Sequence, residues 1–109
     1  MNTTELRKYR ARVAARKHRY GITEEHYDNL IAEQGNACAV CKTPFDDKVR
    51  PNVDHDHNCC PGTRSCGNCL RGLLCSHCLT LASIMETRFK FMNDMFIYLT
   101  KYLTNGGRK

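Results

Sequence analysis

Hydrophobic residues are spaced like one face of a helix near both ends of the chain, and the segment between them lacks this spacing. From residue 6 to residue 19, Leu6, Tyr9 and Val13 form a sparse apolar stripe that predicts a short helix. Gly21 is suited to end this helix because glycine adopts the left-handed conformation at little cost.

Residues 23–34 predict a second helix. Thr23 is a favourable N-cap residue, and Glu24 and Glu25 place negative charge in the first turn, where the helix dipole favours it. Gly35 follows the last helical residue, as expected for a helix that ends there.

A third, longer helix is expected from about Thr80 to Leu103, ending at Asn105-Gly106-Gly107. Its apolar residues recur at spacings of four and three, and they are Met85, Phe89, Met92, Phe96, Leu99 and Leu103. Two interpretations of this wide face are open: packing in the core against the 23–34 helix, and a homodimer interface. We expect the helix to serve both purposes.

The middle segment, residues 36–78, holds all eight cysteines and almost no apolar periodicity. Only residues 51–57 alternate as a strand or hairpin arm would. Because so little apolar surface is available for burial, metal binding must supply much of the folding free energy of this segment.

Composition narrows the class of protein. The chain has 109 residues, enough for one domain, and 17 Lys and Arg against 11 Asp and Glu give a formal charge of +6. Such a charge favours a polyanionic partner, nucleic acid or an anionic membrane surface.

No apolar run is long enough to cross a membrane. The first residues lack the apolar segment of a signal peptide, and we therefore expect the protein to stay in a reducing cytoplasm. In that compartment, clustered cysteines bind zinc more often than they form disulfides.

Basic residues are concentrated in the first predicted helix, which has no acid between residues 6 and 19. This pattern favours an arm that contacts phosphates over a merely solvated helix. The candidate DNA-binding residues there are Arg7, Lys8, Arg10, Arg12, Arg16, Lys17 and Arg19.

Two C-x2-C pairs, Cys38 with Cys41 and Cys75 with Cys78, are separated by 33 residues. Each pair can turn two sulfurs toward one ion, and four thiolates complete the closed tetrahedral set that structural zinc prefers. The alternative is that these residues are ordinary buried cysteines.

Four further cysteines, Cys59, Cys60, Cys66 and Cys69, predict a second zinc site. Adjacent cysteines bind one ion awkwardly, so His57 is considered as a replacement for Cys59 or Cys60. The alternative is a mixture of free and redox-labile thiols.

Residues 53–57 place two acids and two imidazoles in a short extended segment. In a strand, Asp54 and Asp56 would point to one side and His55 and His57 to the other. From the residues alone, this set either binds metal throughout or divides into a metal-holding carboxylate and a general-base histidine.

Three motifs occur in a recognisable order: Cys38-x2-Cys41, then Val-Asp-His-Asp-His at 53–57, then Arg-Gly-Leu-Leu-Cys-x2-Cys at 71–78. From about Tyr20 to Cys78 the chain resembles the phage recombination endonuclease VII family, a zinc-containing branch of the HNH, or ββα-metal (His-Me finger), nucleases. The resemblance implies an α+β fold, with a basic helical arm over residues 1–21 and one zinc-stapled nuclease domain over residues 22–109.

The resemblance also implies roles for individual residues. Cys38, Cys41, Cys75 and Cys78 would bind the structural zinc. Asp54 would hold a catalytic Mg²⁺ or Mn²⁺, His55 would be the general base that activates water, and His57 would support the site. The implied substrate is DNA, including branched or nicked DNA, in the cytoplasm of a bacterial host. Beside these implied roles, Arg64 and Arg71 flank the second cysteine group and are candidates for phosphate contacts.

One position departs from the family pattern. The family has a metal-binding asparagine directly after the last zinc cysteine, where this chain has Leu79. Either water or a phosphate oxygen takes that place, or Asn58, Thr80 or Asp56 does, or catalysis is weakened. Two competing functions follow: a non-catalytic zinc module that binds DNA or a protein, and a partner of a larger phage complex that docks through its last helix.

Overall fold

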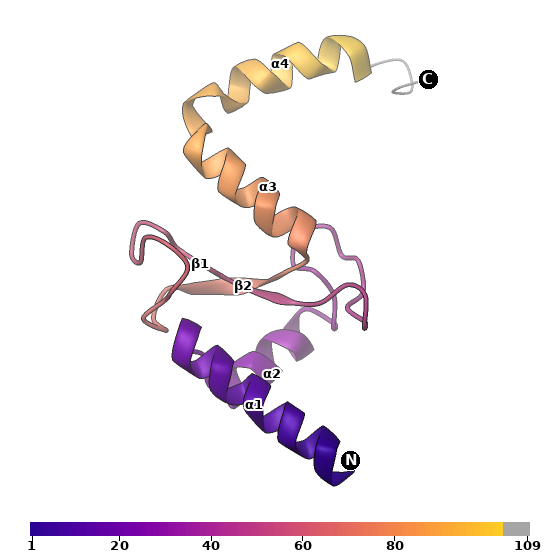
Figure 1. The fold of residues 1–109 in the computed structure, drawn as a ribbon. Coiled ribbons are helices and arrows are strands. Elements are labelled where there is room, and N and C mark those ends of the chain that lie inside the picture. The colour runs from indigo at the N-terminus through magenta and orange to yellow at the C-terminus, as the bar shows by residue number, and fades with distance from the viewer. Residues whose placement is uncertain (104–109) are drawn as a thin grey trace. The chain divides into compact units, whose positions relative to one another are not determined.

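The structure, a computed structural model, describes residues 1–103, which contain four α-helices, one short 3-10 helix and one two-stranded sheet (Figure 1). This mixture of helix and antiparallel sheet is the predicted α+β class. The chain divides into two compact units, residues 1–79 and the residues from Thr80 onward. The predicted division into an arm and one domain stays a prediction.

The first helix, α1 (Thr3–Tyr20), is capped at both ends by local sequence. The side chain of Asn2 accepts a hydrogen bond from the N–H of Glu5 at 2.8 Å. Gly21, with a φ of 69°, ends the helix by donating to the carbonyl of Lys17. The predicted helix over residues 6–19 is confirmed, and it starts three residues earlier because Asn2 provides the cap.

The sheet pairs β1 (Asn52–His55) with β2 (Leu70–Leu74) in antiparallel orientation. Asp54 lies opposite Gly72, and His55 lies opposite Leu70. Arg71 is therefore an extra residue on β2, and the ladder has a bulge there. The predicted strand over residues 51–57 is confirmed only as far as His55, where the chain turns.

The second helix, α2 (Glu24–Glu33), is joined to the sheet by the residue that follows it. Thr23 caps the start of α2 by accepting from the N–H of His26 at 3.0 Å. Past its end, Gln34 donates to the carbonyl of Leu73 at 2.9 Å and accepts from the N–H of Leu73 at 3.0 Å. The glutamine thus pairs with β2 as a neighbouring strand would.

The core of the first unit is small and depends on cysteine. Two of its members are sulfur ligand candidates, which agrees with the prediction that burial alone cannot hold this segment together. The buried hydrophobic residues are Ile22, Cys38, Phe45, Val53, Leu73, Leu74 and Cys75.

The prediction of one uninterrupted helix from Thr80 to Leu103 is wrong. The helix α3 spans Ser76–Thr87, a 3-10 turn η1 spans Phe89–Phe91, and α4 spans Met92–Leu103 (Figure 1). The first of these helices therefore begins before Thr80, within the second cysteine pair, and carries on into the second unit.

The break comes directly after Thr87. The hydroxyl of Thr87 donates to the carbonyl of Ile84 at 2.9 Å, and the same carbonyl accepts the N–H of Arg88 at 3.0 Å. Arg88 then leaves the helical region, with φ −114° and ψ 22°. The β-branched threonine and the two aromatic residues of η1 have lower helix propensity than the residues on either side.

Several apolar side chains of α3 and α4 are exposed, among them Ile84, Met85, Met95, Phe96 and Leu99. Packing of this face on the 23–34 helix and its use as a dimer interface stay predictions. The predicted stop at Asn105-Gly106-Gly107 lies outside the described residues. Among those that are described, no helix has the length and apolarity needed to span a membrane.

Candidate metal centres and active site

The first cysteine quartet, Cys38, Cys41, Cys75 and Cys78, comes together as its spacing predicts. All four sulfurs lie within 4.8 Å of one another, and those of Cys41 and Cys75 are 3.8 Å apart. Zinc–sulfur bonds of about 2.3 Å in a tetrahedron place neighbouring sulfurs about 3.8 Å apart. The quartet therefore has the donor atoms and the dimensions of a structural zinc site, which joins the loop before β1 to the start of α3.

Backbone N–H groups point at these sulfurs. The N–H of Cys75 donates to the sulfur of Cys38 at 3.4 Å. Desolvation opposes ionisation of Cys38, but this and neighbouring N–H bonds outweigh it and lower its pKa to about 6. Desolvation and hydrogen bonds with the other thiols raise the pKa of Cys78 to about 12. Sulfurs packed this closely cannot all become thiolates unaided, and a divalent cation removes that conflict.

The second quartet, Cys59, Cys60, Cys66 and Cys69, also has its four sulfurs within 4.8 Å of one another. The sulfurs of Cys59 and Cys66 are 3.8 Å apart, again the edge of a zinc–sulfur tetrahedron. The N–H of Asn68 donates to the sulfur of Cys66 at 3.4 Å, and this bond is the main cause that lowers the pKa of Cys66 to about 7. This quartet can hold a second zinc ion.

The turn after Asp56 overcomes the awkward geometry expected of adjacent cysteines. Cys59 and Cys60 both donate their N–H groups to the carbonyl of Asp56 at 3.1 Å, and their sulfurs lie 3.9 Å apart. The tight turn after Asp56 thus directs both sulfurs to one point. His57 is not needed as a replacement ligand, and it is not among the residues of the quartet.

We expect two zinc ions per chain in zinc-loaded protein, measured by elemental analysis against protein concentration. The Cys66→Ser variant should hold one, because it loses a ligand of the second quartet alone. One zinc ion in the unsubstituted chain would contradict the second site.

Asp54 is buried on β1 and paired with the bulged residue of β2. Only 6% of Asp54 is exposed. Arg71 donates from Nε to Oδ2 at 2.8 Å and from a terminal nitrogen to Oδ1 at 2.9 Å. This two-pronged contact fixes the carboxylate and satisfies both of its oxygens. Sequence reasoning missed this pair, because a bulge position has no sequence signal of its own. A DNA contact by Arg71 stays a prediction.

His55 is buried next to Asp54, with 4% of its surface exposed. Its Nε2 lies 3.0 Å from the carbonyl oxygen of Cys60. A carbonyl can only accept, so Nε2 carries the proton and Nδ1 is the proton acceptor of the neutral ring. The turn of the second cysteine quartet therefore sets the tautomer of the candidate general base.

His57 lies beside His55, with ring centroids 4.4 Å apart and planes inclined by 47°. The predicted grouping of the two imidazoles is thus present, although β1 ends at His55. Asp56 serves the turn, where its carboxylate accepts from the N–H of Asn58 at 2.9 Å.

The candidate active site offers one carboxylate, that of Asp54, as a ligand for a catalytic Mg²⁺ or Mn²⁺. Asp54 has the oxygen atoms that these ions prefer, although both also accept hydrogen bonds from Arg71. Leu79, in the first turn of α3 after Cys78, has a hydrocarbon side chain and cannot be a ligand. The residues fit a Mg²⁺ that keeps most of its waters, since this ion commonly binds through one or two carboxylates.

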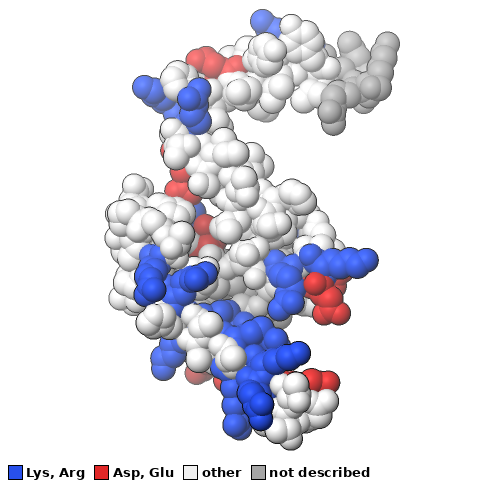
Figure 2. Space-filling view, viewed as in Figure 1, with Lys and Arg blue, Asp and Glu red and all other residues white. Residues whose placement is uncertain are grey.

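The predicted basic residues lie along α1, whose Lys and Arg side chains gather on one side of the first unit (Figure 2). The helix is attached to α2 by two contacts. The guanidinium of Arg16 lies 3.7 Å from the ring centre of Tyr27, and the hydroxyl of Tyr9 donates to Glu24. These contacts give the basic helix a fixed place beside α2.

Comparison with known proteins gives two matches. The sequence model of the family described as recombination endonuclease VII matches residues 13–101. The Gene 59 protein of Mycobacterium phage L5 is 37% identical over 59 residues, which are 54% of this chain and 31% of that protein. The matched region thus covers less than two thirds of that relative. No solved structure matches the chain significantly.

Proposed function

Because the chain belongs to the recombination endonuclease VII family, we propose that it is a metal-dependent endonuclease that hydrolyses phosphodiester bonds in DNA. The observation that supports this most strongly is that two consecutive buried residues of β1 are each held in place: Nε2 of His55 by the carbonyl of Cys60, and the carboxylate of Asp54 by Arg71. Branched or nicked DNA is the proposed substrate. Action in the cytoplasm of a bacterial host stays a prediction.

His55 is the proposed general base. With Nε2–H donated to Cys60, the ring would present Nδ1 to a water molecule and take its proton as the water oxygen attacks phosphorus. The bond from phosphorus to one sugar oxygen breaks in the same step, and that oxygen is the leaving group. The same carbonyl stabilises the imidazolium that results, because the Nε2–H bond strengthens as the ring gains positive charge. His57, next to this ring, is proposed to support its orientation.

Asp54 is the proposed ligand of Mg²⁺ or Mn²⁺, which when bound would neutralise charge on the phosphate. Arg71 holds this carboxylate in one orientation through two hydrogen bonds. In this proposal the residues of β1 divide the chemistry, with one oxygen ligand and one nitrogen base in adjacent positions.

A labelled four-way junction and a linear duplex of the same arm sequences test the proposal. In Mg²⁺ or Mn²⁺, we expect the zinc-loaded chain to cut the junction faster than the duplex. Equal rates would remove the preference for branched DNA, and cleavage of neither would contradict the nuclease.

A second candidate function is a catalytically weakened zinc module that binds DNA or a protein partner. Leu79 favours it, because the site then has one carboxylate where the family has an additional asparagine, and Arg71 already engages that carboxylate. This module would show salt-dependent DNA binding through α1 and no metal-dependent turnover.

The Leu79→Asn variant separates the two candidates. If the absent oxygen limits the site, we expect cleavage to rise by about 10- to 100-fold, with saturation at lower Mn²⁺ concentration. Leu81→Asn is the matched control, because Leu81 is an exposed leucine on the same helix. No gain over that control, in a chain that binds DNA, would contradict a limiting role for Leu79.

A further inference from the structure

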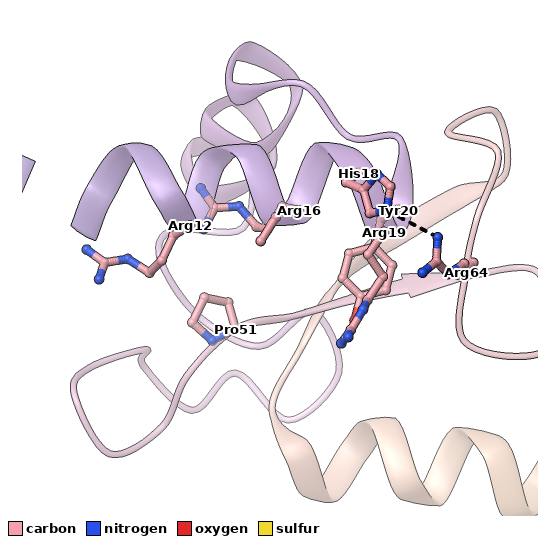
Figure 3. A pocket seen from close by; sticks show the side chains of 8 residues that line it. Arg12, Arg16, His18, Arg19, Tyr20, Pro51 and Arg64 are labelled. Carbon is pink, nitrogen blue, oxygen red and sulfur yellow. Dashed lines mark hydrogen bonds between the residues drawn. The ribbon is translucent and has the colours of Figure 1, made fainter. Parts of the chain in front are cut away.

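A pocket of about 400 Å³ lies between the second half of α1, the segment before β1 and the second cysteine loop (Figure 3). Arginine dominates its lining, and none of the lining residues is acidic. The lining includes Arg12, Arg16, His18, Arg19, Pro51 and Arg64.

The position of Arg64 is fixed by its contact with α1. One of its terminal nitrogens lies 3.3 Å from Nε2 of His18 (Figure 3). A guanidinium can only donate, so His18 accepts through Nε2. Arginine has five N–H donors, and one such bond occupies a single donor.

The loop that carries Arg64 is seated on the end of α1. The N–H of Ser65 donates to the carbonyl of Arg19 at 3.0 Å. The backbones of Gly21 and Gly67 touch: a Cβ on Gly67 would lie 2.6 Å from the carbonyl oxygen of Gly21. Both glycines have positive φ, 69° and 90°, so the contact needs glycine on each side. This approach places Arg64 at the pocket.

The second cysteine quartet holds the same loop closed. Ser65 lies directly before Cys66, and Gly67 lies between Cys66 and Cys69. The four cysteines that exceed the family's single zinc pattern therefore fix an arginine against the basic helix.

Four arginines around one cavity repel one another unless an anion lies among them. Arg16 is partly compensated by its contact with the Tyr27 ring, and no carboxylate lines the cavity to offset the others. The carbonyl of Arg19, the contact between Gly21 and Gly67 and the second cysteine quartet together maintain this arrangement.

We propose that this pocket binds a phosphate group of the DNA backbone, with Arg64 and the arginines of α1 as its donors. The ligand rests on the proposed function, since DNA is the substrate proposed there. In this arrangement the second cysteine quartet serves DNA binding by holding Arg64 in place, as well as orienting His55.

The test compares Arg64→Ala with Lys48→Ala in the full zinc-loaded chain. Lys48 is an exposed lysine outside the pocket, so both variants lose one positive charge. Binding to a labelled duplex is followed by fluorescence anisotropy over a range of KCl, without Mg²⁺ or Mn²⁺, and zinc content verifies the fold. We expect Arg64→Ala to weaken binding by about tenfold or more and to lower the salt slope by about one. Lys48→Ala should change the affinity less than about twofold.

Inorganic phosphate is titrated in parallel to distinguish the source of the phosphate. Weak competition by millimolar phosphate, together with the loss in Arg64→Ala, supports a backbone site. If Arg64→Ala abolishes phosphate binding but leaves DNA affinity equal to that of Lys48→Ala, the pocket takes free phosphate and the proposal is overturned. Equal affinities and slopes for the two variants also overturn it.

These outcomes are independent of cleavage. A chain that needs Arg64 to bind DNA but does not cut it would support the pocket and contradict the nuclease. A chain that cuts DNA and binds it equally well without Arg64 would contradict the pocket alone.

Discussion

The His55→Ala variant is expected to cleave DNA about 10²–10⁴-fold more slowly than the unsubstituted chain. Alanine removes Nδ1, the proton acceptor, and it also removes the bond from Nε2 to the Cys60 carbonyl. Single-turnover cleavage in Mg²⁺ or Mn²⁺ measures the effect. Zinc content and duplex affinity should stay unchanged, because His55 belongs to neither cysteine quartet.

His26→Ala is the matched control for this loss. His26 is an exposed histidine in the first turn of α2, where its backbone N–H, which alanine retains, makes the bond to Thr23. We expect its cleavage rate to equal that of the unsubstituted chain. Cleavage at that same rate by His55→Ala would remove His55 from the mechanism.

The Cys38→Ser variant is expected to lose the first zinc ion and the stable fold of the first unit. Cys38 is fully buried, and its sulfur accepts the N–H of Cys75 at the point where β2 ends. Structural zinc contributes about 10–16 kcal/mol of apparent binding free energy, so a weakened site should lower the free energy of unfolding by about 5 kcal/mol or more. Thermal unfolding followed by circular dichroism, with zinc analysis, measures this.

Cys66→Ser is the comparison for that variant. Its sulfur is exposed and belongs to the second loop, away from the small buried core. We expect a much smaller decrease in melting temperature, with β1 and β2 retained. Equal melting of Cys38→Ser and the unsubstituted chain would contradict a folding role for the first quartet.

Helix ends and the first cysteine pair of the first unit can be predicted from local sequence signals. Gly21 and Thr23 end and start helices through backbone rules that act within a few residues. The C-x2-C spacing of Cys38 with Cys41 predicts a knuckle that directs two sulfurs to one point. These signals are local, so the sequence alone locates them.

The features that the sequence did not predict depend on chain segments meeting in space. Arg71 reaches Asp54 because a bulge shifts β2 by one residue against β1, and the hydrophobic pattern of β2 contains no sign of that shift. The carbonyl of Cys60 meets His55 only after the turn that begins at Asp56 has formed. The hydrophobic pattern does not predict the break at Arg88, because the apolar spacing continues through it although the helix hydrogen bonds do not.

Cleavage of supercoiled plasmid by the purified, zinc-loaded chain tests the central claim most directly. With Mg²⁺ or Mn²⁺ we predict nicked and linear products, which should be absent without these ions and in the His55→Ala variant. A chain that holds its zinc, binds DNA and leaves the plasmid intact in both metals would contradict the nuclease.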